Sequence, residues 1–168
     1  MRHTLLAPLA LALLCSCARP ASRPPAAAAS DDERAVLAVV DRLFAAMRTK
    51  DSAEMRRLFE PRALLFGMRP RPTGETVIQA TPWERFATFN ASDNREWIER
   101  TFNPEVRVRG TLATVWTEYD FHFGSTPSHC GVDAVQLMKT SAGWRIVSIA
   151  DTYETTGCAA RPAPTGGR

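Results

Sequence analysis

The sequence has little net charge and almost no lysine. Lysine and arginine together number 21, aspartate and glutamate number 18, and the formal net charge is +3 at pH 7. The lysines are only Lys50 and Lys139, and the arginines are dispersed along the chain. Nucleic-acid-binding domains gather basic residues on one face. We therefore expect no nucleic-acid partner and attribute the excess of arginine over lysine to genomic base composition.

Long apolar runs and glycine-rich motifs are also missing. The run Leu5–Leu14 spans about ten residues, whereas a membrane-spanning helix needs about twenty. The 9 glycines form no nucleotide-binding loop, and no internal repeat is present. The sequence therefore gives no reason to expect a nucleotide, and we predict no cofactor.

The short apolar run fits a secretion signal instead. It follows a cationic start and ends in Leu14-Cys15-Ser16-Cys17. Signal h-regions have about 7–15 apolar residues. Cys17 has the small Ser16 directly before it, whereas Cys15 follows the bulky Leu14. We predict that residues 1–17 are a lipoprotein signal peptide and that Cys17 is lipidated.

This signal predicts a bacterial cell-envelope protein, anchored to a membrane by lipid and facing the periplasm or the cell exterior. Ordinary cleavage near Ala18 or Ala21 is the alternative and would release an unanchored protein. Residues 18–30 are rich in proline and alanine and are predicted to form a tether. Residues 31–158 form one predicted domain, and residues 159–168 form a predicted disordered tail.

Cysteine is scarce once the signal is removed. Cleavage takes Cys15 away and acylation occupies Cys17, so Cys130 and Cys158 remain of the four. An even number of cysteines in an oxidising compartment favours a disulfide between these two. A reactive or metal-binding thiol is the alternative.

Helical patterns come first in the domain, and strand patterns follow. Ser30 and Glu33 form a capping box at the start of an apolar 3.6-residue repeat that ends near Arg48. Asp51 begins a second, shorter helix. This order predicts an α+β fold, with helices on one face of a curved, mainly antiparallel sheet. The other expected elements are a helix over 81–90, a loop over 69–72, and strands over 63–68, 76–80, 96–102, 106–109, 112–123, 129–139 and 144–153.

Four segments resemble the nuclear transport factor 2-like superfamily, which includes ketosteroid isomerase and SnoaL-like polyketide cyclases. They are the first helix running into Arg48-Thr49-Lys50-Asp51, then Met55–Ala63, Gly110–Trp116 and Gly143–Val147, and together they span residues 32–153. Ser128–Asp133 with the later Cys158 resembles an uncharacterised secreted bacterial subgroup. The resemblance implies a cone-shaped half-barrel with a pocket between sheet and helices, but no single chemistry.

Strand alternation predicts which side chains face that pocket. The set on one face of 112–123 is largely apolar with one phenol, Tyr119. If the loop 124–128 turns symmetrically, Tyr119 lies opposite Asp133. An acid on this apolar face would have a raised pKa, and a neighbouring phenol would donate to an oxyanion, as in ketosteroid isomerase. The expected pocket face of this strand is Val115, Thr117, Tyr119, Phe121 and Phe123.

Asp133 and Tyr119 are therefore the candidate catalytic residues. The alternative is that Asp133 accepts backbone or arginine hydrogen bonds and organises the sheet. A register slip of one residue would reverse every face. The strand Ala63–Met68 has no ionisable group where enzymes of the superfamily place an acid or base. This departure weakens the expectation of isomerase-like catalysis.

Trp97 is predicted at the pocket mouth, on the same side of its strand as Glu99. The expected ligand-binding residues are Trp97, Tyr119, Phe121 and Asp133. The remaining tryptophans are assigned to the core by default, with Trp116 an alternative contact on the outer sheet face, where dimers of this superfamily form.

Glu118, Asp120 and His122 share the opposite face of their strand and would form a polar surface, a proton relay or a metal site. Further possible metal ligands are His129, Cys130 and Asp133. Zinc sites favour closely spaced ligand pairs that this pattern lacks. We therefore predict no metal.

Three function classes follow from these expectations. The favoured one is a lipid-anchored domain that binds a small apolar or amphipathic molecule in its cone. The others are an isomerase- or cyclase-type enzyme using Asp133 and Tyr119, and an accessory lipoprotein whose outer sheet face binds another protein, including a second copy of itself.

Overall fold

The computed structural model describes residues 29–161. The predicted signal peptide, Cys17, most of the tether 18–30 and residues 162–168 lie outside this range. Within it, no helix combines the length and hydropathy that crossing a membrane requires.

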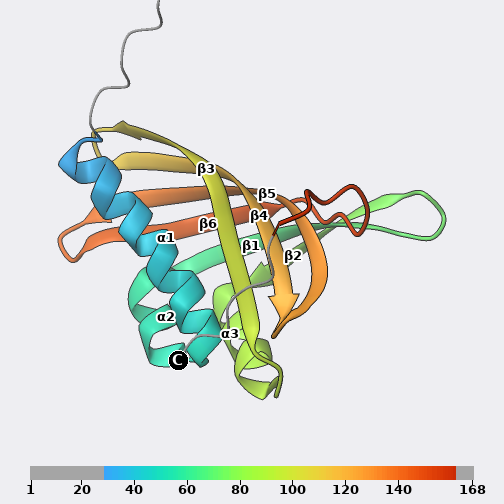
Figure 1. The fold of residues 1–168 in the computed structure, drawn as a ribbon. Coiled ribbons are helices and arrows are strands. Elements are labelled where there is room, and N and C mark those ends of the chain that lie inside the picture. The colour runs from blue at the N-terminus through green and yellow to red at the C-terminus, as the bar shows by residue number, and fades with distance from the viewer. Residues whose placement is uncertain (1–28, 162–168) are drawn as a thin grey trace, which may run out of the picture.

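Three helices pack on one face of the sheet (Figure 1). α1 spans Asp31–Thr49 and begins with the predicted capping box of Ser30 and Glu33. α2 spans Ser52–Leu58, and the side chain of Asp51 caps it by accepting from the Glu54 amide at 2.8 Å. α3 spans Trp83–Ser92, and Pro82 is its N-cap.

The six strands form one curved sheet in the order β2-β1-β6-β5-β4-β3. All neighbours are antiparallel except β1 and β6, which pair in parallel. This confirms the α+β class with a mixed, mostly antiparallel sheet. The strands are β1 Phe59–Pro70, β2 Thr76–Pro82, β3 Trp97–Arg109, β4 Leu112–Phe123, β5 Thr126–Thr140 and β6 Gly143–Asp151.

Two strands are longer than the sequence pattern predicted. β1 includes Arg69 and Pro70, which we expected in a loop, because β2 pairs with this end of the strand and Arg69 lies opposite Val77. β3 is continuous through Asn103 and Pro104, where two strands were expected. Pro104 has no backbone N–H to donate to β4. The strand accommodates it with a bulge between Phe102 and Glu105 and a positive φ of 51° at Asn103.

The core lies between the helices and the inner face of the sheet. One face of α1 is buried against it, with Val36, Val40 and Leu43 all at most 2% exposed. Trp83 and Trp144 belong to the same core. Trp116 instead lies on the outer face, 56% exposed, together with Leu112 and Met138.

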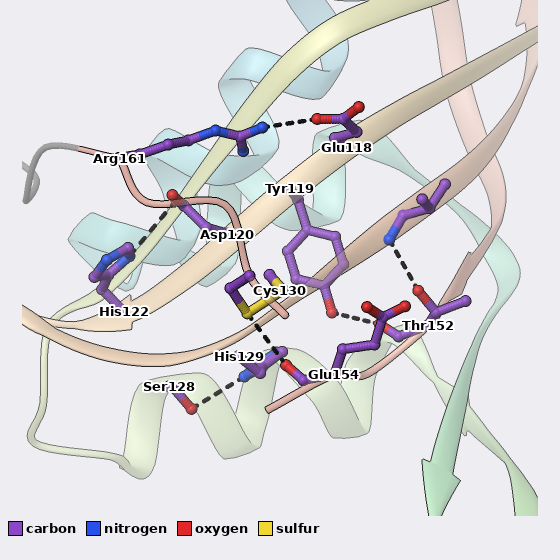
Figure 2. The surroundings of a disulfide bond; sticks show 12 residues. Glu118, Tyr119, Asp120, His122, Ser128, His129, Cys130, Thr152, Glu154 and Arg161 are labelled. Carbon is purple, nitrogen blue, oxygen red and sulfur yellow. Dashed lines mark hydrogen bonds and ion pairs between the residues drawn. A yellow bond between two sulfur atoms is a disulfide. The ribbon is translucent and has the colours of Figure 1, made fainter. Parts of the chain in front are cut away.

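The segment after β6 is fastened to the sheet by a disulfide between Cys130 and Cys158, as predicted (Figure 2). Backbone hydrogen bonds in both directions join Cys130 to Glu154. Arg161 then pairs with Glu118 at 2.7 Å and covers the ring of Phe102. Arg161, in the predicted tail 159–168, therefore contacts the sheet.

Candidate functional site

A cavity of about 550 Å³ lies between the helices and the inner face of the sheet. The predicted ligand-binding residues Trp97, Tyr119, Phe121 and Asp133 all line it. Aromatic side chains dominate its wall, because the sheet alternation and the inward faces of α1 and α3 direct them to one place. The other aromatic lining residues are Phe44, Phe86, Phe89, Phe123, His129 and Tyr153.

Trp97 is the centre of an aromatic cluster at one side of the cavity. Its ring is met edge-on by four phenylalanine rings at centroid distances of 5.5 to 6.3 Å. Its indole N–H donates to Asp93 at 3.0 Å. These contacts hold the indole in place, so the apolar wall is formed before any ligand enters.

The strand register differs from the prediction by two residues. Tyr119 lies opposite Gly131, and Asp133 lies opposite Thr117. The hairpin turns at Gly124-Ser125, since Phe123 pairs with Thr126, and a bulge follows between Phe121 and His122. A symmetric 124–128 loop was therefore the wrong assumption. Because the error is an even number of residues, the faces stay as predicted.

The hydroxyl of Tyr119 is already engaged. It donates to the backbone carbonyl of Thr152 at 2.6 Å (Figure 2). Burial raises the pKa of this phenol far above its ordinary value. Tyr119 would have to release Thr152 before it could donate to a ligand at Asp133.

Gly131 is the reason that Thr152 comes so close to the sheet. A Cβ at this position would lie 2.4 Å from the Thr152 carbonyl oxygen. The amide of Val132 also donates to the Thr152 hydroxyl at 2.9 Å. The missing side chain at 131 therefore creates the space in which the carbonyl meets the Tyr119 hydroxyl.

Glu99 and Asp133 form a carboxyl pair at the floor of the cavity. Burial, followed by the charge of Asp133 and a hydrogen bond to it, raises the pKa of Glu99 well above its ordinary value. Burial raises the pKa of Asp133 to about 7, while the hydrogen bond from Glu99 opposes this rise. Burial thus favours the protonated form of both carboxyl groups, and a hydrogen bond joins Glu99 to Asp133.

Asp133 has few partners for a buried acid. The residue is 3% exposed, and apart from the Glu99 carboxyl no group of the described residues reaches its Oδ2 with a hydrogen bond. A buried carboxylate that no positive charge accompanies is costly. This carboxyl group is the strongest sign of a ligand in the cavity.

A third acid, Asp151, lies beside the pair. It faces Asp133 directly across β5 and β6, and Arg69 of β1 binds it at 2.7 Å. Burial raises the pKa of Asp151, and the Arg69 guanidinium opposes this rise. The guanidinium also lies 4.5 Å from the centroid of the Tyr153 ring, so one arginine connects the acid to the aromatic wall.

His129 is held among aromatic rings as a neutral imidazole. It stacks on Tyr153 at 4.1 Å and on Phe121 at 4.9 Å between centroids, and its Nδ1 is 3.0 Å from the Ser128 hydroxyl. Burial, and then the charge of Arg69, lower its pKa to about 4. His129 therefore contributes apolar surface and no positive charge at neutral pH.

The polar row on the opposite face of β4 is occupied by ion pairs. Arg100 binds Asp120 through two nitrogens at 2.6 and 2.8 Å. Figure 2 shows that Glu118 pairs with Arg161 and that His122 lies beside Asp120, at 3.6 Å. Among residues 29–161, no three histidine, cysteine or acidic side chains gather as metal ligands.

Sequence reasoning placed Asp133 in the pocket but missed its partners. Glu99 was predicted on the same side of its strand as Trp97. Its pairing with Asp133 was not predicted, because the two residues lie on β3 and β5, which are not neighbours in the sheet. Asp151 is two residues after the apolar Ile149, so strand alternation places both side chains on the same face, and this indication that Asp151 faces the cavity was overlooked. Arg69 carried no such signal, because it was expected in a loop.

Comparisons with known proteins agree with this fold. Residues 36–150 match the model of the SnoaL-like domain family. An NTF-2 like protein of unknown function from Silicibacter pomeroyi is 19% identical with a TM-score of 0.54, over 72% of this chain and 94% of that one. An NTF2-like protein from Cytophaga hutchinsonii is 14% identical with a TM-score of 0.59, over 74% and 99%.

The CaMKII hub of S. rosetta is similar as well, at 18% identity and a TM-score of 0.59, over 74% of this chain and 98% of that one. The search of curated proteins found no match. Identities this low establish the common fold and leave the chemistry to be argued from the site itself.

Proposed function

The chain belongs to the SnoaL-like domain family, of the nuclear transport factor 2-like superfamily, and from this premise we propose that it binds a small, largely apolar molecule in its cone. Ligand sites are typically concave and mostly apolar, with a few convergent polar groups. The cavity of about 550 Å³ falls within the usual size range of such sites.

The observation that carries this proposal is the buried Asp133 in the wall of an aromatic cavity, with no donor to its Oδ2 among the described residues other than the Glu99 carboxyl. The rings supply apolar surface for the body of a ligand. The carboxyl pair supplies an acceptor at a fixed point, so a bound molecule would be oriented with a hydrogen-bond donor toward Asp133.

We further propose that Cys17 anchors this domain in the bacterial cell envelope. The disulfide between Cys130 and Cys158 supports an oxidising compartment, since structural disulfides are rare in reducing ones. The cone would then meet molecules outside the cytoplasm.

Acid–base catalysis is the second candidate function, and the carboxyl pair favours it. Asp133, with a pKa of about 7, is suited to accept a proton, and the protonated Glu99 is suited to keep it oriented. Tyr119 would stabilise the developing oxyanion after leaving Thr152. In this case Asp133→Asn would abolish turnover of an enolisable ketone while the variant keeps the wild-type circular dichroism spectrum; unchanged turnover would exclude the role.

Native mass spectrometry of the protein purified from its own host tests the binding proposal. We expect a retained small molecule in the wild type. Thr81 lines the cavity, so Thr81→Trp should fill it and remove that mass. Thr114→Trp, on the outer face of β4, is the matched control and should keep the ligand. Equal ligand occupancy in both variants would reject the cone as the site.

A further inference from the structure

We propose that the ligand is an organic cation, a small aromatic or alicyclic amine whose ammonium group binds Oδ2 of Asp133 and whose apolar body lies among the rings. This inference rests on the proposed function and deepens it. Three independent features of the cavity support it.

The first feature is the scarcity of partners around Asp133. This residue lines the cavity, is 3% exposed, and has no donor to its buried Oδ2 among the described residues other than the Glu99 carboxyl. Its other interactions do not supply a positive charge, because Glu99 gives it only a neutral hydrogen bond. An ammonium group carries both the N–H donor and the charge that this oxygen lacks.

The second feature is the balance of charge. Three carboxyl groups, Glu99, Asp133 and Asp151, meet at the floor. Two arginines line the cavity: Arg69 is already bound to Asp151 at 2.7 Å, and Arg85 lies at an exposed position on α3. When Asp133 is ionised, neither arginine lies within ion-pair distance to neutralise it. A monovalent cation would neutralise it.

The third feature is the aromatic wall. Ring faces attract cations, and buried cation–π contacts are among the stronger ones. Two arginines already use rings that line this cavity: Arg69 lies 4.5 Å from the Tyr153 centroid and Arg95 lies 3.5 Å from that of Phe123. The wall is therefore suited to a cationic ligand, whereas an anionic one would face the ring electrons and Asp133 together.

Binding should be linked to the ionisation of Asp133. Below neutral pH, Asp133–COOH and R–NH₃⁺ combine to give the ion pair Asp133–COO⁻···⁺H₃N–R, and one proton passes to the solvent. The other groups facing the site are Glu99 of β3, Tyr119 of β4, His129 of β5, Asp151 of β6, Arg69 of β1 and Arg85 of α3. Of these, Tyr119, whose pKa burial raises, and His129, whose pKa burial lowers to about 4, stay neutral throughout this range.

The test uses protein expressed from the full sequence and three probes of matched shape: 2-phenylethylamine, 2-phenylethanol and phenylacetate. Calorimetric titrations are run at about pH 6 and about pH 8. We expect the amine to bind at least tenfold more tightly than the alcohol at the higher pH and to lose about tenfold in affinity at the lower one. Phenylacetate should bind most weakly.

Two variants and a control assign the effect. Asp133→Asn should remove the preference for the amine and its pH dependence, with the affinity for the alcohol kept within about threefold. Glu99→Gln keeps a neutral donor beside Asp133 and should retain the preference. Asp41→Asn, at an exposed position on α1, is the control and should match the wild type.

The failures are distinguishable. If the alcohol binds as well as the amine, or if the preference survives Asp133→Asn or is lost in Glu99→Gln, the cation assignment is overturned and the proposed function stands. If native mass spectrometry of the protein from its host finds a neutral or anionic bound molecule, the cation assignment is likewise overturned and the proposed function stands. If no probe binds and the host protein carries no ligand, both proposals are overturned.

Discussion

Asp133 shows how one residue takes its character from its neighbours. Its strand places it on an apolar face, and the register places it opposite Asp151. Burial opposes its charge, and the hydrogen bond from Glu99 partly restores it. The combined result is a carboxyl that ionises near neutral pH at the floor of a cavity, where a surface aspartate would be ionised near pH 4.

The raised pKa of Asp133 predicts that the free energy of unfolding falls as pH increases. A carboxyl that binds its proton more tightly in the folded state than in the unfolded state stabilises the fold below its unfolded pKa. That contribution is lost as pH rises through the folded value of about 7. Asp133→Asn should therefore be more stable than the wild type at about pH 8, by about 2–3 kcal/mol, and should show a flatter pH profile in urea denaturation.

The matched control for that experiment is Asp41→Asn, which should follow the wild-type profile. A wild-type stability that rises steadily between about pH 5 and about pH 8 would contradict the proposed state of Asp133.

Gly131 gives a second prediction at the scale of single residues. Gly131→Ala places a Cβ 2.4 Å from the Thr152 carbonyl, a backbone atom that cannot yield without moving the segment after β6. We expect a loss of about 2–4 kcal/mol in the free energy of unfolding. Gly67→Ala is the control, since its Cβ would meet only the far end of the Arg69 side chain, at 3.0 Å, and no backbone atom. An equal loss in both variants would contradict this account.

At the scale of elements, the local signals in the sequence were sufficient where one segment decides the outcome. The capping box of α1 and the Asp51 cap of α2 were predicted from a few residues. The two faces of β4 were also predicted correctly, because the alternation of side chains depends only on the strand itself.

Features that depend on distant segments were not predicted. Arg69 belongs to β1 because β2 returns to pair with it, and the register of β4 on β5 depends on a bulge that no residue type announces. The Glu99–Asp133 pair joins two strands with β4 between them. The candidate site was therefore found in part: its residues on single strands were predicted, and their partners were not.

The C-terminal segment gives a prediction at this same scale. The disulfide closes a loop over a sequence separation of 28 residues, which in the chain-entropy model stabilises the fold by about 3–4 kcal/mol. Cys158→Ser should lower the free energy of unfolding by that amount and increase amide hydrogen exchange at Thr152 and Glu154 first. Reductant should change the wild type in the same direction and leave the variant unchanged. Unaltered exchange at both amides would show that the segment holds without the bond.

For the whole molecule, the fold and the proposed anchor define a cone held near a membrane by a tether. If Cys17 carries the lipid, Cys17→Ser should move the protein from the membrane fraction to the soluble fraction of its host, since removal of the acyl chains removes the anchor. Cys15→Ser should leave fractionation unchanged, because Cys15 precedes the proposed cleavage site. Membrane association of both variants would exclude lipidation at Cys17.

The central claim is that the cone holds a buried carboxyl pair, Glu99 and Asp133, in the wall of a largely apolar cavity and uses it to bind a ligand. The most direct measurement is the ¹³C chemical shift of the Asp133 side-chain carboxyl as a function of pH, with and without 2-phenylethylamine. The account predicts titration at about 7 in the free protein and a lower pKa with the amine bound. An ordinary pKa near 4 in the free protein would contradict it.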